Sequence, residues 1–164
     1  MKVWVQKEYA FSASHLLPHH AGQCRQLHGH NYRVLVSVER ACLAATMNTK
    51  RPDSGMLMDF AEMDTIIKPV ITLLDHSHLN DTLPIVARSH AITYQANRLL
   101  AWEGELDEAD DADFAPTAEV LALVIGAWFQ GVWLDARRNE IVTAPKVRVT
   151  VFETDKCSAG VELD

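Results

Sequence analysis

In the run HGHNYRVLVSVE, residues 28–39, the character of the side chains changes at every second position. The even positions carry His28, His30 and Tyr32, followed by three valines. The odd positions are mostly polar: Asn31, Arg33, Ser37 and Glu39. A period of two is typical of a β-strand, because successive side chains point to opposite faces of a sheet. The run therefore predicts a strand that opens with two histidines on one face.

A second strand is predicted upstream, over residues 3–15. Its odd positions are mostly apolar, and the last of them is His15. Residues 18–23 (PHHAGQ) contain turn formers and no periodicity, so Cys24 falls in or just after a connecting loop. The two strands are expected to form a hairpin with a long loop.

Two helices are predicted further along the chain. Asp59 and Glu62 have the spacing of a capping box, and apolar residues then recur at helical intervals toward Asp75. Pro69 lies inside this helix and should kink or shorten it. A second helix begins near Thr117, which follows a proline and can act as the cap, and continues through residue 133.

The remaining segments predict one strand, one helix and one loop. Valines at 147, 149 and 151 alternate along a C-terminal strand, and Glu153 is the next residue on the same face. Residues 90–102 read as a further helix, and the acidic run at 103–111 as a solvated surface loop.

The three strand-end histidines predict a metal site. Residues two apart on a strand project from one face, about 6.6 Å apart at Cα, so His28 and His30 can converge on one ion. His15 completes the set of three that catalytic zinc uses while leaving a position open. Imidazole suits zinc, copper, iron or nickel equally well, so the ligand type does not choose the metal.

Alternatives stay open for several of these residues. A His-x-His pair can be two polar side chains on a strand, although a third histidine argues against this. Four other histidines lack such placement and are read as surface or loop residues: His19, His20, His78 and His90. Cys24 could serve as a base, since a nearby cation would stabilise its thiolate. It could equally be a fourth ligand that closes the site, or a plain buried thiol, as Cys42 and Cys157 are taken to be.

Two further sets of acids and imidazoles are candidates. Asp75 and His76 lie together at a helix end, where the carboxylate could orient the ring for proton transfer. Glu153 would be costly to bury without a partner, so it either reaches solvent or meets a ligand rich in hydrogen-bond donors.

Bulk properties limit the class of protein. At 164 residues and 18.3 kDa the chain predicts one domain. A net charge of -7 argues against nucleic-acid binding. The first eight residues lack the apolar run of a signal peptide, and no later stretch is expected to approach a membrane span, so a cytoplasmic protein that does not bind membranes is predicted. Three cysteines in such a chain make a disulfide framework improbable.

Six motifs taken together resemble the 6-pyruvoyltetrahydropterin synthase family. They are Phe11-Ser12-Ala13-Ser14-His15, Cys24 to Tyr32, Leu74-Asp75-His76, Leu79-Asn80, Pro116-Thr117-Ala118-Glu119 and Val151-Phe152-Glu153-Thr154. The resemblance covers nearly the whole chain as one domain, 1–164, apart from an atypical acidic insertion at about 83–115. Three residues separate Cys24 from His28, which looks like the bacterial 6-carboxytetrahydropterin synthase branch, as do Glu153-Thr154 and Cys157 to Gly160.

The resemblance implies an α+β tunnelling fold (T-fold). Its antiparallel four-stranded sheet carries two helices on one face, and subunits close into a barrel and form a homo-oligomer, expected to be a hexamer built as a dimer of trimers. The missing fourth strand would lie near Ser54 to Asp59.

The resemblance also implies a zinc-dependent lyase acting on 7,8-dihydroneopterin triphosphate in 7-deazaguanine and queuosine biosynthesis. Its products would be 6-carboxy-5,6,7,8-tetrahydropterin, acetaldehyde and triphosphate. Zinc would be held by His15, His28 and His30, and Cys24 would move carbon-bound protons. The remaining roles fall to Asp75 and His76 from a neighbouring subunit as a proton relay, to Glu153 as the pterin anchor, and to Thr117, Glu119 and Arg25 as substrate contacts. A pyruvoyl-forming synthase or a dihydroneopterin-acting paralogue, and a non-catalytic metal-binding module, are the competing interpretations.

Overall fold

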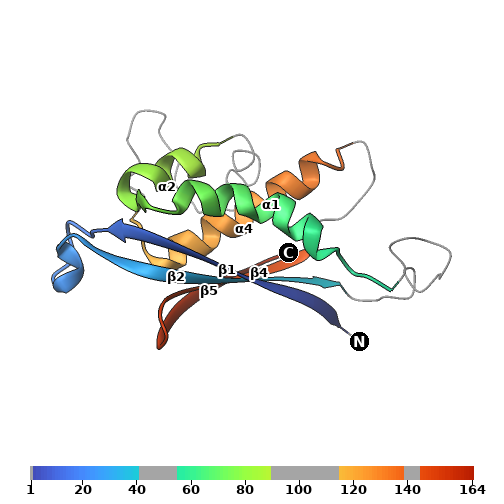
Figure 1. Cartoon of the computed structure of the whole chain (residues 1–164), viewed down its shortest axis with the longest axis horizontal. Helices are drawn as coiled ribbons and strands as arrows, with labels where there is room; N and C mark the ends of the chain where they lie inside the picture. Colours follow the sequence, from blue (N-terminus) through green and yellow to red (C-terminus); the bar gives the residue numbers. More distant parts are fainter. Residues whose placement is uncertain (1, 41–54, 90–114, 139–144) are drawn as a thin grey trace.

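The computed structural model describes residues 2–40, 55–89, 115–138 and 145–164. These residues form an α+β layer structure in which the helices lie on one side of a sheet (Figure 1). The elements in chain order are β1 (Val3–His15), the 3-10 helix η1 (Gln23–Arg25), β2 (His28–Arg40), α1 (Phe60–Leu74), β3 (Ser77–His78), α2 (Leu79–Ala87), α4 (Ala118–Asp135), β4 (Lys146–Thr154) and β5 (Cys157–Leu163).

The hairpin predicted from the alternating pattern is confirmed. Strands β1 and β2 pair antiparallel along their whole length, from Val3 opposite Arg40 to His15 opposite His28. Their alternate residues face the helices and are buried, as the period of two predicted. The residues between the strands form the long connecting loop, which contains η1.

The sheet differs from the expected one in its strands. It has five strands in the order β3-β1-β2-β4-β5, and the two-residue strand β3 pairs parallel to β1. The strand expected near residues 54–59 is absent from the described part of that range, 55–59, which forms a turn and bends. The fourth long strand is instead β5, directly after β4.

A tight turn at residues 155–156 explains the position of β5. Thr154 pairs with Cys157, and the Thr154 hydroxyl accepts hydrogen bonds from the backbone N–H of Lys156 (3.3 Å) and Cys157 (3.1 Å). These two hydrogen bonds stabilise the turn without a glycine, so the sequence contains no obvious turn signal for this hairpin.

The described part of the helical layer contains three helices, whereas the resemblance implied two, and α2 was not predicted from the sequence. Helix α1 runs through Pro69 to Leu74 without ending early. Asp59 caps α1 by accepting from the N–H of Ala61, and Thr117 caps α4 by accepting from that of Val120, both as predicted. The predicted helix at 90–102, the acidic run at 103–111 and Cys42 lie outside the described residues.

Helix α4 is the central core helix. By length and composition it could cross a membrane, with a mean hydropathy of 1.3 over 18 residues, which corrects the expectation that no stretch approaches a span. However, 61% of this window is buried inside the fold, as in the core helix of a globular protein. Side chains such as Leu121, Ile125 and Phe129 are completely buried. Burial on all sides explains an apolar helix without a membrane.

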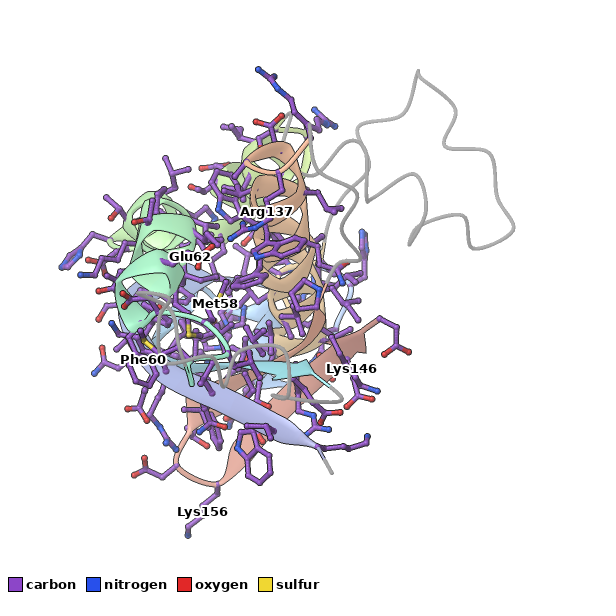
Figure 2. The ribbon with its side chains drawn as sticks, turned by 90° about the vertical axis from the view of Figure 1, so that its right-hand side faces the viewer. Met58, Phe60, Glu62, Arg137, Lys146 and Lys156 are labelled. Carbon is purple, nitrogen blue, oxygen red and sulfur yellow. The ribbon has the colours of Figure 1, made fainter. Side chains whose placement is uncertain are left out.

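Polar contacts join α4 to α1 across the helical layer. Arg137 and Glu62 face one another between the two helices and form an ion pair (Figure 2). The Arg137 guanidinium also lies 4.3 Å from the centre of the Trp133 ring. The indole N–H of Trp128 donates to the carbonyl of Ile66 at 2.8 Å. These contacts fix the two helices over the face of the sheet that carries the histidines.

Candidate metal centre

The three predicted ligands come together on the helix-covered face of the β1–β2 hairpin. His15 ends β1 and lies opposite His28, while His30 lies opposite Ala13. The ring centres are 4.4 Å apart for His15 and His28, 5.1 Å for His15 and His30, and 5.0 Å for His28 and His30. One nitrogen from each ring lies within 4.8 Å of the others, an arrangement that could hold a metal ion.

Backbone carbonyls orient two of the rings. Nδ1 of His15 lies 2.7 Å from the carbonyl oxygen of Pro116, and Nδ1 of His28 lies 2.7 Å from that of Gln26. A carbonyl only accepts, so each Nδ1 carries the proton and each Nε2 is left with a free lone pair. Metal-binding histidines commonly have their second nitrogen held in this way.

The Nε2 atom of His15 is the strongest sign that the cluster fits a metal. His15 is 2% exposed, and within the described ranges its buried Nε2 has no hydrogen-bond partner. Burial, the largest effect, lowers the pKa of His15, so the ring is held in the neutral form that binds metals. An unpaired buried acceptor is costly unless an ion or ligand completes it.

Gly29 permits the close pairing that positions two of the ligands. A Cβ atom at this position would lie 2.9 Å from the carbonyl oxygen of Ala13 on β1, closer than side chains normally approach. The glycine between the histidines therefore lets β2 pair with β1 at the point where both rings leave the strand.

Asn80 is a residue of the site's frame whose role the sequence did not reveal. Its side-chain amide clamps the peptide after His15, accepting from the N–H of Leu16 at 3.0 Å and donating to its carbonyl at 2.9 Å. This bidentate contact fixes the end of β1 at the ligand. Its only sign in the sequence was the Leu79-Asn80 motif.

Cys24 lies in η1 of the loop and is partly buried. Its carbonyl accepts from the N–H of Leu17 at 2.8 Å, which ties the loop across its own base. In the described part of the chain, the only group of possible ligand atoms that gather closely enough for a metal consists of the three histidines. The cysteine is therefore outside the cluster, which supports an open site over a closed four-ligand one.

Glu153 lies near the histidines on the same face of the sheet. The register of β4 with β5 shifts between Phe152 and Thr154, so Glu153 sits at an irregularity that can redirect its side chain. Its charge acts on His15 and on Tyr32. The sequence left open whether this carboxylate reaches solvent or meets a ligand, and its role stays a prediction.

Asp75 and His76 lie apart from the cluster, beyond the opposite edge of β1. The Asp75 carboxylate accepts from the N–H of Ser12 at 2.9 Å and lies 2.9 Å from Nδ1 of His76. These two bonds lower the pKa of Asp75, the one from Ser12 most strongly. His76 has a positive φ of 55° and an 85% exposed side chain. It lines a shallow depression together with Ser12, Ser14 and Asn31, and the candidate ligand His30 also lines this depression.

The other predicted substrate contacts lie on three different segments. Thr117 uses its hydroxyl to cap α4, and Glu119 is exposed in the first turn of that helix. Arg25 is exposed at the end of η1. Pro116, just before the cap, is the residue whose carbonyl orients His15, so the start of α4 contacts the cluster directly.

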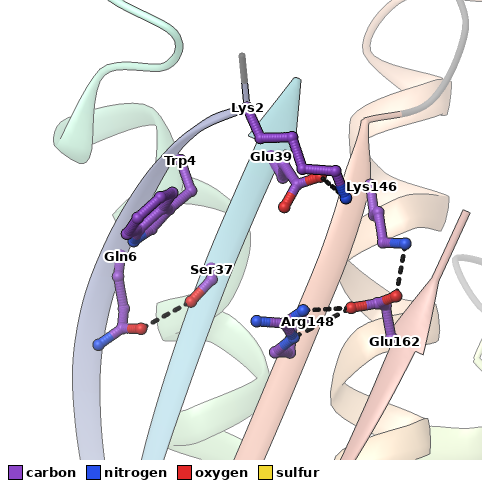
Figure 3. Close-up of a pocket in the computed structure, with 8 residues that line it drawn as sticks. All are labelled: Lys2, Trp4, Gln6, Ser37, Glu39, Lys146, Arg148 and Glu162. Atoms are coloured by element: carbon purple, nitrogen blue, oxygen red, sulfur yellow. Dashed lines mark hydrogen bonds and ion pairs between the residues drawn. The ribbon is translucent and has the colours of Figure 1, made fainter. Parts of the chain in front are cut away.

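A second depression, on the open face of the sheet, contains a network of ion pairs (Figure 3). Lys2 pairs with Glu39 at 3.0 Å, and Glu162 pairs with both Lys146 and Arg148. These two cations lower the pKa of Glu162 to about 2. Because the opposite charges satisfy one another, this groove carries no free reactive group comparable to the histidine cluster.

Comparison with known proteins identifies relatives over nearly the whole chain. The family described as 6-pyruvoyl tetrahydropterin synthase matches residues 4–163. A protein from Synechocystis sp. named 6-carboxy-5,6,7,8-tetrahydropterin synthase is 41% identical over 85 residues, which cover 49% of this chain and 61% of the relative. The protein of the same name from Haemophilus influenzae is 32% identical over 78 residues, covering 47% and 52%. The matches thus span little more than half the length of these relatives.

Solved structures share the fold at lower identity. The 6-pyruvoyl tetrahydropterin synthase of Caenorhabditis elegans superposes with a TM-score of 0.63 at 19% identity, covering 100% of this chain and 97% of the other. The Plasmodium vivax 6-pyruvoyltetrahydropterin synthase gives a TM-score of 0.59 at 17% identity, covering 100% and 99%. These likenesses concern the arrangement of strands and helices.

Proposed function

The chain belongs to the 6-pyruvoyl tetrahydropterin synthase family, and from this premise we propose that it is a zinc-dependent cytoplasmic lyase of the 6-carboxytetrahydropterin type. The proposed reaction converts 7,8-dihydroneopterin triphosphate to 6-carboxy-5,6,7,8-tetrahydropterin, releasing acetaldehyde and triphosphate on the route to queuosine. The observation that carries the proposal is a cluster of three histidines with a cysteine near it in sequence but outside it in space. Two relatives with this reaction in their names support it.

The histidines would hold the zinc through their Nε2 atoms. The carbonyls of Pro116 and Gln26 already fix the rings of His15 and His28 in the tautomer that this requires. When bound, zinc would act as a Lewis acid toward the side-chain hydroxyls of the substrate. Three protein ligands leave a coordination position for that contact.

Proton transfer would fall to Cys24 and to the Asp75–His76 pair. Cys24, as a thiolate, would remove a carbon-bound proton from one side of the pterin and return it. Asp75 holds Nδ1 of His76, so Nε2 is the nitrogen left to exchange a proton. Because the His76 side chain is 85% exposed, it would serve the site of a neighbouring subunit in a homo-oligomer, a hexamer in this proposal.

Unpaired strand edges support assembly. Among the described residues, β1 has an outer neighbour only at Ala13 and Ser14, where β3 pairs with it, and β5 ends the sheet on the other side. Exposed edges of this length invite pairing with another chain. A second copy of the chain paired along such an edge would also bring its own Asp75–His76 pair next to this chain.

Substrate binding would use acids for the pterin and a cation for the phosphates. Glu153, acceptor-only when ionised, would take the ring N–H and amino group of the pterin, with Thr117 and Glu119 as further contacts. Arg25, three residues before His28, would contact the triphosphate. Neighbouring subunits would supply the remaining positive charge for a chain of net charge -7.

A product assay tests this proposal. Zinc-loaded protein is incubated with 7,8-dihydroneopterin triphosphate, and the products are identified by mass spectrometry for wild type, Cys24→Ala and the matched control Cys157→Ala, whose thiol is exposed on β5. Loss of a general base should lower turnover by about 100-fold or more in Cys24→Ala alone.

Each outcome has a distinct meaning. Acetaldehyde and 6-carboxytetrahydropterin from wild type and the control support the proposal. A pyruvoyl product would assign the chain to the sister reaction. Retained metal with no turnover in any variant would support the non-catalytic metal-binding module and refute the lyase.

A further inference from the structure

Tyr32 is a buried polar residue at the histidine cluster that the proposed reaction does not use. Its side chain lies on the same face of β2 as His28 and His30 and is 1% exposed. Its hydroxyl is buried, and among the residues that the structure describes it has no hydrogen-bond partner. A phenol in such a position normally finds a partner, because an unpaired buried hydroxyl costs free energy.

The ring of Tyr32 is held from three sides. It stacks on Phe11 of β1, with ring centres 4.8 Å apart and planes 16° from parallel. It meets His30 and His15 edge to face, at 5.5 Å and 6.1 Å between ring centres. With the ring fixed beside the cluster by these contacts, the hydroxyl has little freedom to turn toward another partner.

The electrostatic surroundings favour a donor at this place. The Glu153 carboxylate acts on both Tyr32 and His15, so all three groups share one region of the helix-covered face. The unpaired Tyr32 hydroxyl can donate a hydrogen bond to an acceptor that enters this region.

We propose that Tyr32 is a ligand-recognition residue whose hydroxyl donates a hydrogen bond to an oxygen atom of the ligand that binds at the histidine cluster. The ligand completes the unpaired hydroxyl, as the metal completes the unpaired Nε2 of His15. The hydroxyl thereby selects ligands with an oxygen acceptor over ligands of similar size without one, since a site left with an unpaired buried donor rejects the latter. This inference rests on the metal centre of the proposed function.

The test compares Tyr32→Phe with Tyr9→Phe in cobalt-loaded protein. Tyr32→Phe removes one oxygen atom and keeps the stacked ring. Tyr9, a buried residue of the neighbouring strand β1, is the matched control. Its hydroxyl already has a protein partner, Asp64, at 3.2 Å. Acetohydroxamate, which offers oxygen atoms, and imidazole, which offers none, are titrated separately, and binding is followed by the visible absorption of the cobalt.

The two variants should behave in opposite ways. Tyr32→Phe should bind acetohydroxamate about 10- to 100-fold more weakly than wild type, the range for losing a hydrogen bond to a charged acceptor, and imidazole equally well. Its apo thermal midpoint should be unchanged or raised, because no protein hydrogen bond is lost. Tyr9→Phe should have a lower midpoint and unchanged affinity for both probes.

Other results would overturn the inference. Equal acetohydroxamate affinity in Tyr32→Phe and wild type would show that the hydroxyl does not contact the ligand. Equal weakening for both probes would show a change in the metal centre rather than recognition of oxygen. Failure of wild type to bind cobalt would refute the metal centre itself, and with it the proposed function, whereas the first two results leave that function intact.

Discussion

Replacing Gly29 by alanine should separate the geometry of the histidine cluster from the general stability of the sheet. The added Cβ would lie 2.9 Å from the carbonyl oxygen of Ala13 and 3.5 Å from Cα of Ser14, both on the paired strand β1. The nearest atom belongs to the backbone, so it cannot rotate away as a side chain would. The two strands must therefore move apart locally, close to the positions of His15, His28 and His30.

The expected cost follows from that contact. Ordinary contacts of a Cβ begin near 3.4 Å, so the carbonyl has to shift by about 0.5 Å. Overpacking of this kind costs about 1–3 kcal/mol. Alanine recovers about 0.5–1 kcal/mol, because glycine loses more conformational freedom on folding. The net loss in the free energy of unfolding should be about 1 kcal/mol, near the middle of the resulting range of about 0 to 2.5 kcal/mol. The affinity for zinc should fall by about 10-fold or more, as for other changes around metal ligands that disturb their orientation.

Gly160→Ala is the matched control. Its Cβ would lie 2.9 Å from the carbonyl of Val149 in the β4–β5 pair, the same kind of contact at a different place in the sheet. Denaturant unfolding of the apo proteins measures stability, and competition with a chelator measures zinc affinity. Both variants should lose stability to a similar extent, but only Gly29→Ala should lose affinity.

Two results would refute the reasoning. If Gly29→Ala is as stable as wild type, the steric argument is wrong. If it is destabilised but binds zinc as tightly as wild type, the close approach of the strands does not set the geometry of the ligands.

Three further predictions concern stability. Leu121→Ala, in the core of α4, should cost about 2–5 kcal/mol in denaturant unfolding, whereas Ile85→Ala at a 71% exposed position should cost less than about 0.5 kcal/mol; equal costs would contradict the assigned core. Hydrogen bonds from Lys7 and then Lys68 lower the pKa of Asp64 from 3.8 to about 2, so its stabilising contribution is present above pH 3.8 and is lost as the pH falls toward 2. Asp64→Asn should therefore reduce the acid-induced decline in the free energy of unfolding. An unchanged pH profile in this variant would refute the role of these lysines. Zinc at about 100 times its dissociation constant should raise the unfolding free energy by about 2.7 kcal/mol, and a chelator should reverse the gain; a zinc-independent midpoint would mean that the folded state has no zinc site.

Strong periodicity explains which elements were predictable. Strands β1 and β2 are long, and β1 ends and β2 begins with histidines, so a period of two located both the sheet and the histidine cluster. Helices α1 and α4 begin at capping residues, Asp59 and Thr117, whose side chains accept from the first turn. In each case the local signal and the tertiary packing agree.

Short or edge elements were not found for physical reasons. Strand β3 has two residues and depends on pairing with β1, which no local pattern encodes. Strand β5 has its apolar residues, Ala159, Val161 and Leu163, on one face, but Gly160 and polar residues between them weaken the signal, and the preceding turn uses the Thr154 hydroxyl. The resemblance to the family led to the expectation of a fourth strand near residues 54–59, before β4, whereas the fourth long strand, β5, follows β4.

The residues of the candidate site likewise divide into those that the sequence could predict and those that it could not. The three histidines were predictable because strand spacing alone brings them together. The separation of Asp75 and His76 from them depends on where α1 ends relative to β1, through bonds to Ser12. The unpaired hydroxyl of Tyr32 depends on three-dimensional burial. In the sequence Tyr32 was only one more member of the buried face.

The central claim is that three histidines form an open metal centre, and X-ray absorption of protein loaded with one equivalent of zinc tests it most directly. The account predicts nitrogen ligands at about 2.0–2.1 Å and no sulfur, with the spectrum unchanged in Cys24→Ala. A zinc–sulfur shell near 2.3 Å that disappears in Cys24→Ala would show a closed four-ligand site and contradict the account.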